Sequence, residues 1–144
     1  MTNERAARAY EVTWLIRRLF RAMASKADGY LADAGLSAAD RAVMEFLYPD
    51  CALSVPDIAR RYDVSRQHVQ QTVNGLIRRG LARSADNPRH KRSRLIRLSS
   101  LGRDCFAEIR NNESSLVEEL FTHIPDTDLN VTYQTLRLLH DKLK

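Results

Sequence analysis

The chain has 144 residues, of which 44% are hydrophobic and 28% charged, with five glycines and four prolines. This length and composition exclude a disordered chain and favour one folded, helix-rich domain. The formal net charge of +5 suits nucleic acid or an anionic membrane surface and does not choose between them.

The first predicted element is a long amphipathic helix over residues 5–34, where apolar side chains recur at spacings of three and four. Gly35 is placed to end it. Ser37 followed three residues later by Asp40 is a helix N-cap signal, which predicts a second helix that runs to about Tyr48.

Two short helices joined by a tight turn are predicted next, over residues 55–62 and 66–79. Ser54 and Ser65 are good N-caps for them, and Gly80 closes the second. The apolar residues that would anchor both helices are Ile58, Ala59, Val64, Val69, Val73 and Leu76. This spacing is typical of a helix-turn-helix motif.

The opposite face of the second short helix is polar and carries no acid. Arginine can pair with guanine, and glutamine or asparagine with adenine, in the major groove of double-stranded DNA. We therefore expect DNA contact by this face, although a polar helix face is often merely solvated. The candidate DNA-binding residues are Ser65, Arg66, Gln67, His68, Gln70, Gln71 and Asn74.

A β-hairpin with a basic tip is predicted between Leu81 and Leu98, around the turn-prone Asp86-Asn87-Pro88. Nine cations lie between Arg78 and Arg103, against Asp86 as the single acid. Flexible cations at such a tip can reach the sugar-phosphate backbone. The candidate wing residues are Arg89, His90, Lys91, Arg92 and Arg94.

Helical spacing resumes after Gly102 and again after Pro125. The terminal segments are more apolar than two peripheral helices of a monomer need, which favours a homodimer, with packing inside one chain as the alternative. The predicted dimer contacts are Leu15, Leu129, Leu136, Leu139 and Leu143.

Three segments together resemble the MarR family of bacterial winged helix-turn-helix transcription regulators: residues 65–81, 87–92 and 98–102. The last reads Leu-Ser-Ser-Leu-Gly, similar to the Leu-Thr-x-x-Gly that follows the wing in that family. The resemblance implies an obligate homodimer with interleaved terminal helices, a palindromic operator and a small, often phenolic, ligand. The family's wing usually has Asp two residues before its Arg, and His90 before Arg92 implies that this wing lacks an Asp–Arg pair.

The predicted fold is therefore mainly α with a small β-hairpin wing, in a single domain of residues 1–144. A winged helix-turn-helix over about residues 36–102 is flanked by dimerisation helices over about 5–34 and 103–144. The predicted function is a sequence-specific transcriptional regulator, a ligand-responsive dimeric repressor. The alternatives are a non-sequence-specific architectural DNA-binding protein and a winged-helix protein-interaction module.

Other functions have little support in the sequence. The four histidines are scattered without metal-ligand spacing or paired carboxylates, so we expect no enzyme, no catalytic residue and no metal. The expected small molecule is an aromatic effector, with no cofactor. No run of about 18 apolar residues and no signal peptide is present, and the two cysteines lack CxxC spacing, which predicts a cytoplasmic protein without membrane contact and with core thiols.

Overall fold

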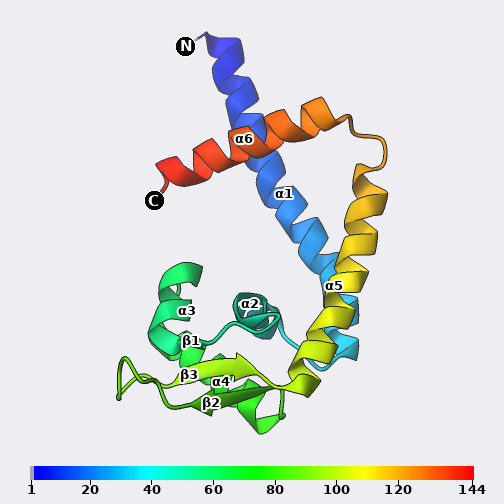
Figure 1. Cartoon of the computed structure of the whole chain (residues 1–144). Helices are drawn as coiled ribbons and strands as arrows, with labels where there is room; N and C mark the ends of the chain where they lie inside the picture. The colour runs from blue at the N-terminus through cyan, green and yellow to red at the C-terminus, as the bar shows by residue number, and fades with distance from the viewer. Residues whose placement is uncertain (1) are drawn as a thin grey trace. The chain divides into compact units, whose positions relative to one another are not determined.

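The computed structural model describes residues 2–144, so Met1, the first residue of the predicted domain, lies outside the described residues. Its elements follow one another along the chain as Figure 1 shows: α1 (Asn3–Asp33), α2 (Ala38–Leu47), β1 (Leu53–Ser54), α3 (Val55–Tyr62), α4 (Arg66–Arg78), β2 (Ala82–Ala85), β3 (Leu95–Leu98), α5 (Ser100–Phe121) and α6 (Asp126–Lys142). This order confirms the predicted fold class, mainly helical with a small antiparallel sheet.

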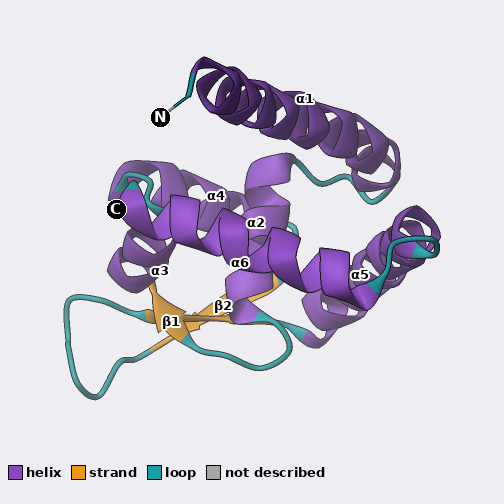
Figure 2. Cartoon of the chain, turned by 90° about the horizontal axis from the view of Figure 1, so that it is seen from above, coloured by secondary structure: helices purple, strands orange, loops and turns teal. Residues whose placement is uncertain are grey.

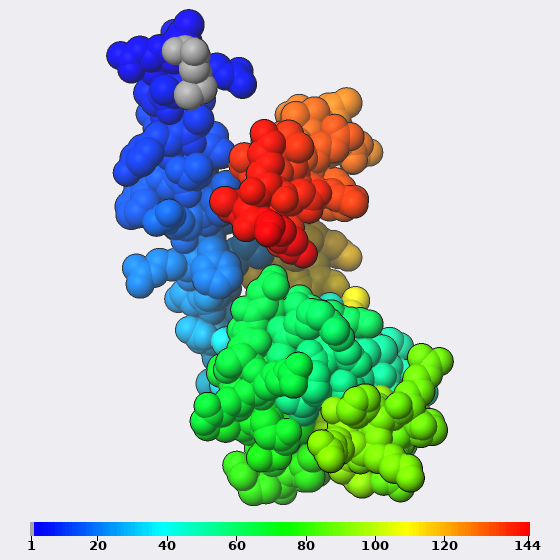
Figure 3. All heavy atoms as spheres, turned by 90° about the vertical axis from the view of Figure 1, so that its left-hand side faces the viewer, coloured from blue at the N-terminus to red at the C-terminus, as the bar shows by residue number. Residues whose placement is uncertain are grey.

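The chain divides into two compact units. The first ends at Arg110, and the second runs from Asn111 to Lys144. In the first unit, α2, α3, α4 and the hairpin form one dense body, from which α1 projects (Figure 3). The C-terminal end of α1 is fixed to that body, because Leu31 is buried in its core.

The core of the first unit is built by one face of each short helix. Its fully buried side chains come from α2, α3, α4, β3 and α5, and they are Val43, Met44, Leu47, Ile58, Val69, Val73, Leu76, Leu98 and Phe106. Four of the six anchors predicted for the helix-turn-helix are among them: Ile58, Val69, Val73 and Leu76. Ala59 is also buried, and Val64 is partly buried against the core. Ile109 is also buried, so the core of the winged motif extends beyond the predicted boundary at residue 102 and includes the first turns of α5.

Serine N-caps begin α2, α3 and α4, as the sequence predicts. The Ser37 hydroxyl accepts a hydrogen bond from the Asp40 amide at 3.1 Å, and the Asp40 carboxylate accepts one from the Ser37 amide at 2.9 Å. The Ser54 and Ser65 hydroxyls accept from amides three residues further on, at 3.3 and 3.1 Å. Each serine thus satisfies an amide that has no partner inside its helix.

The hairpin belongs to a three-stranded antiparallel sheet in the order β1-β3-β2. Strands β2 and β3 pair from Ala82 opposite Leu98 to Ala85 opposite Leu95, and β1 adds Leu53 opposite Ile96. The strands lie side by side in Figure 2, and the loop between β2 and β3 reaches away from them. The sequence did not predict β1, because two residues are too few to show a strand alternation.

The beginning of α5 corrects the sequence analysis. The helix begins at Ser100 rather than after Gly102, and Gly102 lies buried in its first turn. The Ser99 hydroxyl accepts from the Gly102 amide at 3.0 Å and donates to the Gly80 carbonyl at 2.6 Å. A Cβ at Gly102 would lie 1.9 Å from the Leu81 carbonyl oxygen, so only glycine permits this approach of α5 to the segment before β2.

Candidate nucleic-acid interface

Helix α4 presents the predicted recognition face to solvent. Val69, Val73 and Leu76 are fully buried and fix one side of the helix. All seven predicted residues on the other side are exposed: Ser65, Arg66, Gln67, His68, Gln70, Gln71 and Asn74. The Gln70 amide nitrogen donates to the Asn74 side-chain oxygen at 2.9 Å, which orders two side-chain amides of this face relative to each other. The face therefore offers hydrogen-bond donors and acceptors and no carboxylate.

Arg94 connects the two sides of the wing at its base. Its guanidinium lies 2.7 Å from the Asp86 carboxylate and donates to the Ser84 hydroxyl at 3.0 Å, across the base of the loop. The expectation that the wing lacks an acid–arginine pair is therefore wrong, because Asp86 and Arg94 form one from other positions. The charge of Arg94 is paired with Asp86 inside the hairpin, whereas Arg92 has no ion-pair partner among residues 2–144.

Two hollows bring the helix and the wing together. The first, of about 420 Å³, is lined by Arg66, Gln67 and Gln70 of α4 together with Arg92 and Arg94 of the wing. The second, of about 340 Å³, places Arg66 beside Arg89 and His90. The structure thus gathers part of the predicted set around one concave surface, which we call the basic groove: Arg66, Gln67, Gln70, Arg89, His90, Arg92 and Arg94. The other predicted residues of the recognition face line neither hollow: Ser65, His68, Gln71 and Asn74. Lys91 is exposed and lines neither of these two hollows.

Arg60 was not predicted from the sequence, and it lines the second hollow from the last turn of α3. Arg60 forms an ion pair with Asp57 in the preceding turn. Hydrogen bonds from Arg60 and Ser54 hold the pKa of the Asp57 carboxyl below its ordinary value. The signal available in the sequence was the Arg60-Arg61 pair at the end of the first short helix. Cations there also interact favourably with the negative end of the helix dipole.

Comparison with known proteins agrees with this geometry. Residues 34–93 match the sequence model of the MarR family. A solved MarR family transcription regulator has the same fold, with a TM-score of 0.88 at 19% identity over 97% of this chain and 93% of that one. The winged helix-turn-helix segment matches the MarR family. Its fold is the winged-helix DNA-binding fold of these transcription regulators.

Two further proteins are similar to this chain, one in sequence and one in fold. An uncharacterized protein of Mycobacterium tuberculosis is 36% identical over 95 residues, a segment that spans 66% of this chain and 66% of that protein, just under two thirds of its length. CouR from Rhodococcus jostii RHA1, solved bound to p-coumaroyl-CoA, has a TM-score of 0.78 at 20% identity and covers 89% of this chain and 90% of its own.

The terminal helices of this chain leave many large apolar side chains in contact with solvent. In α1, Leu15 and Phe20 are 59% and 73% exposed. The predicted dimer contacts in and beside α6 are also exposed: Leu129, Leu136, Leu139 and Leu143. Exposed apolar surface of this extent is typical of an interaction surface.

The remaining side chains of residues 2–144 form no metal centre. Among residues 2–144 no group of three histidine, cysteine or acidic side chains could hold a metal ion. No helix in that range is long and apolar enough to cross a membrane. Cys51 and Cys105 are free and half-buried against the core. Burial and the nearby Glu108 raise the pKa of the Cys105 thiol.

Proposed function

We propose that this chain is a sequence-specific DNA-binding transcription regulator in which α4 reads base edges and the wing contacts the backbone. The observation that carries the proposal is the outward face of α4, which is exposed, rich in amides and free of acid, opposite three fully buried anchors. A carboxylate there would repel phosphate, and amides can form the bidentate pairs that distinguish bases.

The two elements supply different kinds of free energy. Hydrogen bonds from Gln70, Gln71 and Arg66 to base edges discriminate between sequences, whereas Lys91 and Arg92 act through counterion release from phosphates. A non-sequence-specific architectural protein would need the cations but not the ordered Gln70–Asn74 pair. A protein-interaction module would need neither. The amide pair therefore favours the regulator over both alternatives.

We further propose that the functional molecule is a homodimer. A winged-helix dimer places its two recognition helices on half-sites about one helical turn apart, so the operator would be palindromic. The exposed apolar faces of α1 and α6 are the candidate surfaces that a second copy would bury. A C2 dimer closes such surfaces on themselves without leaving an open chain of copies.

Repression and its release by a small aromatic effector are the last part of the proposal. Their support is the match of residues 34–93 to the MarR family and the aromatic acyl group in the ligand of CouR. Such a regulator would act in the cytoplasm, where bacterial DNA lies. Loss of operator affinity on titration with aromatic acids or their thioesters would support this part, and unchanged affinity across the panel would contradict it.

The main test is a set of salt titrations on an operator, selected from the fragments of source DNA that the protein retains, and on a scrambled duplex. Gln70→Ala and Gln71→Ala should each cost about 1 to 3 kcal/mol on the operator and little on the scrambled duplex. Lys91→Ala and Arg92→Ala should weaken binding to both duplexes alike. Each lost phosphate contact should reduce the slope of log affinity against log salt by about 0.9.

The same titrations separate the alternatives. Equal affinity for operator and scrambled duplex would identify an architectural protein. Binding without a salt dependence, or no binding at all, would identify an interaction module. Equal losses of specificity from helix and wing substitutions would contradict the proposed division between base reading and phosphate contact.

A further inference from the structure

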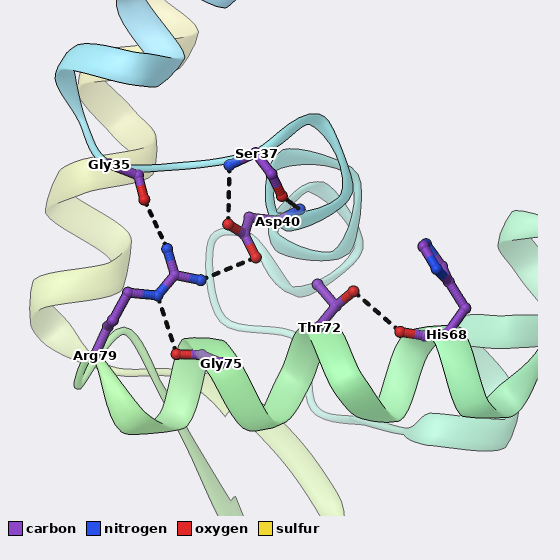
Figure 4. Close-up of polar contacts among 7 residues, drawn as sticks. All are labelled: Gly35, Ser37, Asp40, His68, Thr72, Gly75 and Arg79. Atoms are coloured by element: carbon purple, nitrogen blue, oxygen red, sulfur yellow. Dashed lines mark hydrogen bonds and ion pairs between the residues drawn. The ribbon is translucent and has the colours of Figure 1, made fainter.

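Arg79, the C-cap residue of α4, joins three elements through one side chain, as Figure 4 shows. Its Nε donates to the Gly75 carbonyl in the last turn of α4 at 3.0 Å. One terminal nitrogen donates to the Gly35 carbonyl at the end of α1, at 2.7 Å. The other lies 3.0 Å from the Asp40 carboxylate in the first turn of α2. We call these contacts the Arg79 bridge.

Asp40 is the fixed partner in this bridge. It is only 7% exposed, and its two carboxylate oxygens contact different partners. Oδ2 accepts from the Ser37 amide and caps α2, while Oδ1 receives Arg79. A carboxylate in such a position needs a cation, because burial without a partner disfavours its charged form. Asp40 also lies at the positive end of α2, and Arg79 lies at the negative end of α4.

Gly35 makes the bridge a joint between α1 and α4. It follows Ala34, the C-cap of α1, and has a φ of +69°, the left-handed conformation that ends the helix and turns the chain toward α2. Its carbonyl is held by Arg79 across 44 positions of sequence. Three contacts in the fixed geometry of one guanidinium therefore hold the end of α1, the start of α2 and the end of α4 together.

We propose that the Arg79 bridge sets the angle between the recognition helix and α1, and through it the spacing of the two recognition helices in the dimer. This inference rests on the proposed function. Helix α4 has 13 residues, so it is about 20 Å long. A tilt of about 10° at its bridged end would move its base-reading end by about 3.4 Å, which is one base-pair step. Arg79 is thus a positioning residue, remote from the bases that the helix reads.

A direct phosphate contact by Arg79 is the competing explanation, and Arg78 provides the matched control. Arg78 is the adjacent arginine, is exposed, and has no ion-pair partner among residues 2–144. Arg79→Lys and Arg78→Lys both keep their charge. The lysine at position 79 still faces Asp40 and keeps the carboxylate paired, so the fold is retained. One ammonium group cannot reach all three acceptors of the bridge in the way that the planar guanidinium does.

The experiment measures the affinity of the full-length wild type, Arg79→Lys, Arg79→Gln and Arg78→Lys for operators of native half-site spacing and of one base pair more or less. The wild type and Arg78→Lys should prefer the native spacing by about tenfold. Both Arg79 variants should lose most of that preference, and Arg79→Lys should do so with an unchanged salt slope.

The outcomes distinguish the bridge from the proposed function. Retention of the wild-type spacing preference by Arg79→Lys, or its loss together with a shallower salt slope, would overturn the bridge and leave the regulator intact. A wild type that binds its selected operator no better than a scrambled duplex would overturn the regulator and the bridge with it. If Arg79→Gln does not fold, Arg79→Lys alone decides between these results.

Discussion

Replacing Gly102 by alanine would place a methyl carbon 1.9 Å from the carbonyl oxygen of Leu81 and 2.9 Å from its carbonyl carbon. Non-bonded carbon atoms pack best at about 3.5 to 4.0 Å, so α5 and Leu81 would have to separate by roughly 1.5 Å. The added methyl carbon is fixed to the backbone of α5, and the Leu81 carbonyl is itself backbone, so no side-chain rotation can relieve the contact. The separation would also pull on the hydrogen bond from the Ser99 amide to the Leu81 carbonyl, which is 3.0 Å long.

The expected loss follows from three contributions. Overpacking costs about 1 to 3 kcal/mol and the weakened hydrogen bond about 1, whereas the better helix propensity of alanine returns up to about 1 kcal/mol. The net loss is therefore about 2 kcal/mol. For a chain of this length that lowers the melting temperature by about 4 to 8 °C.

Gly29→Ala is the matched control, because it is the same substitution in the helix α1. Nothing lies within 4 Å of the added methyl group at Gly29, so only the gain in helix propensity remains. This variant should melt about 2 to 4 °C higher than the wild type. Circular dichroism at one protein concentration measures both changes. A Gly102→Ala variant that melts at or above the wild type would refute the close approach of α5 to Leu81.

Two further predictions concern assembly and redox chemistry. Deleting Leu129 to Lys144 removes the exposed leucines of α6, so light scattering should find monomer or aggregate; a folded, monodisperse dimer would count against the proposed interface. Peroxide should leave operator affinity unchanged, because the raised pKa of Cys105 keeps its thiol protonated at neutral pH; a reversible loss of affinity that disappears in Cys105→Ser or Cys51→Ser would show a redox switch instead.

The helix boundaries could be predicted from the sequence because their signals are local. A serine cap and the amide that it satisfies are three residues apart, and glycine after a helix needs no distant partner to be recognised. The predicted bounds of α3 coincide with the observed Val55–Tyr62 for this reason. Gly102 was misplaced because its role depends on Leu81, a residue in another element that no periodic pattern connects to it.

The same distinction between local and distant partners decides which charges are available for DNA. The sequence alone suggests that the nine cations from Arg78 to Arg103 form one electrostatic surface. Four of them have acidic partners in the folded chain: Arg79 with Asp40, Arg94 with Asp86, and both Arg97 and Arg103 with Asp50. Two of these acids, Asp40 and Asp50, lie outside the basic segment, so the sequence could not assign these pairs.

Five cations of that segment remain without an acidic partner among residues 2–144: Arg78, Arg83, Arg89, Lys91 and Arg92. If each met one phosphate, the segment would contribute a salt slope of at most about 4.5 for each subunit, whereas nine free cations would contribute about 8. Three of the five, Arg89, Lys91 and Arg92, lie at the tip of the wing. The tip of the wing keeps its positive charge because Asp86, the acid beside it in the sequence, is paired with Arg94.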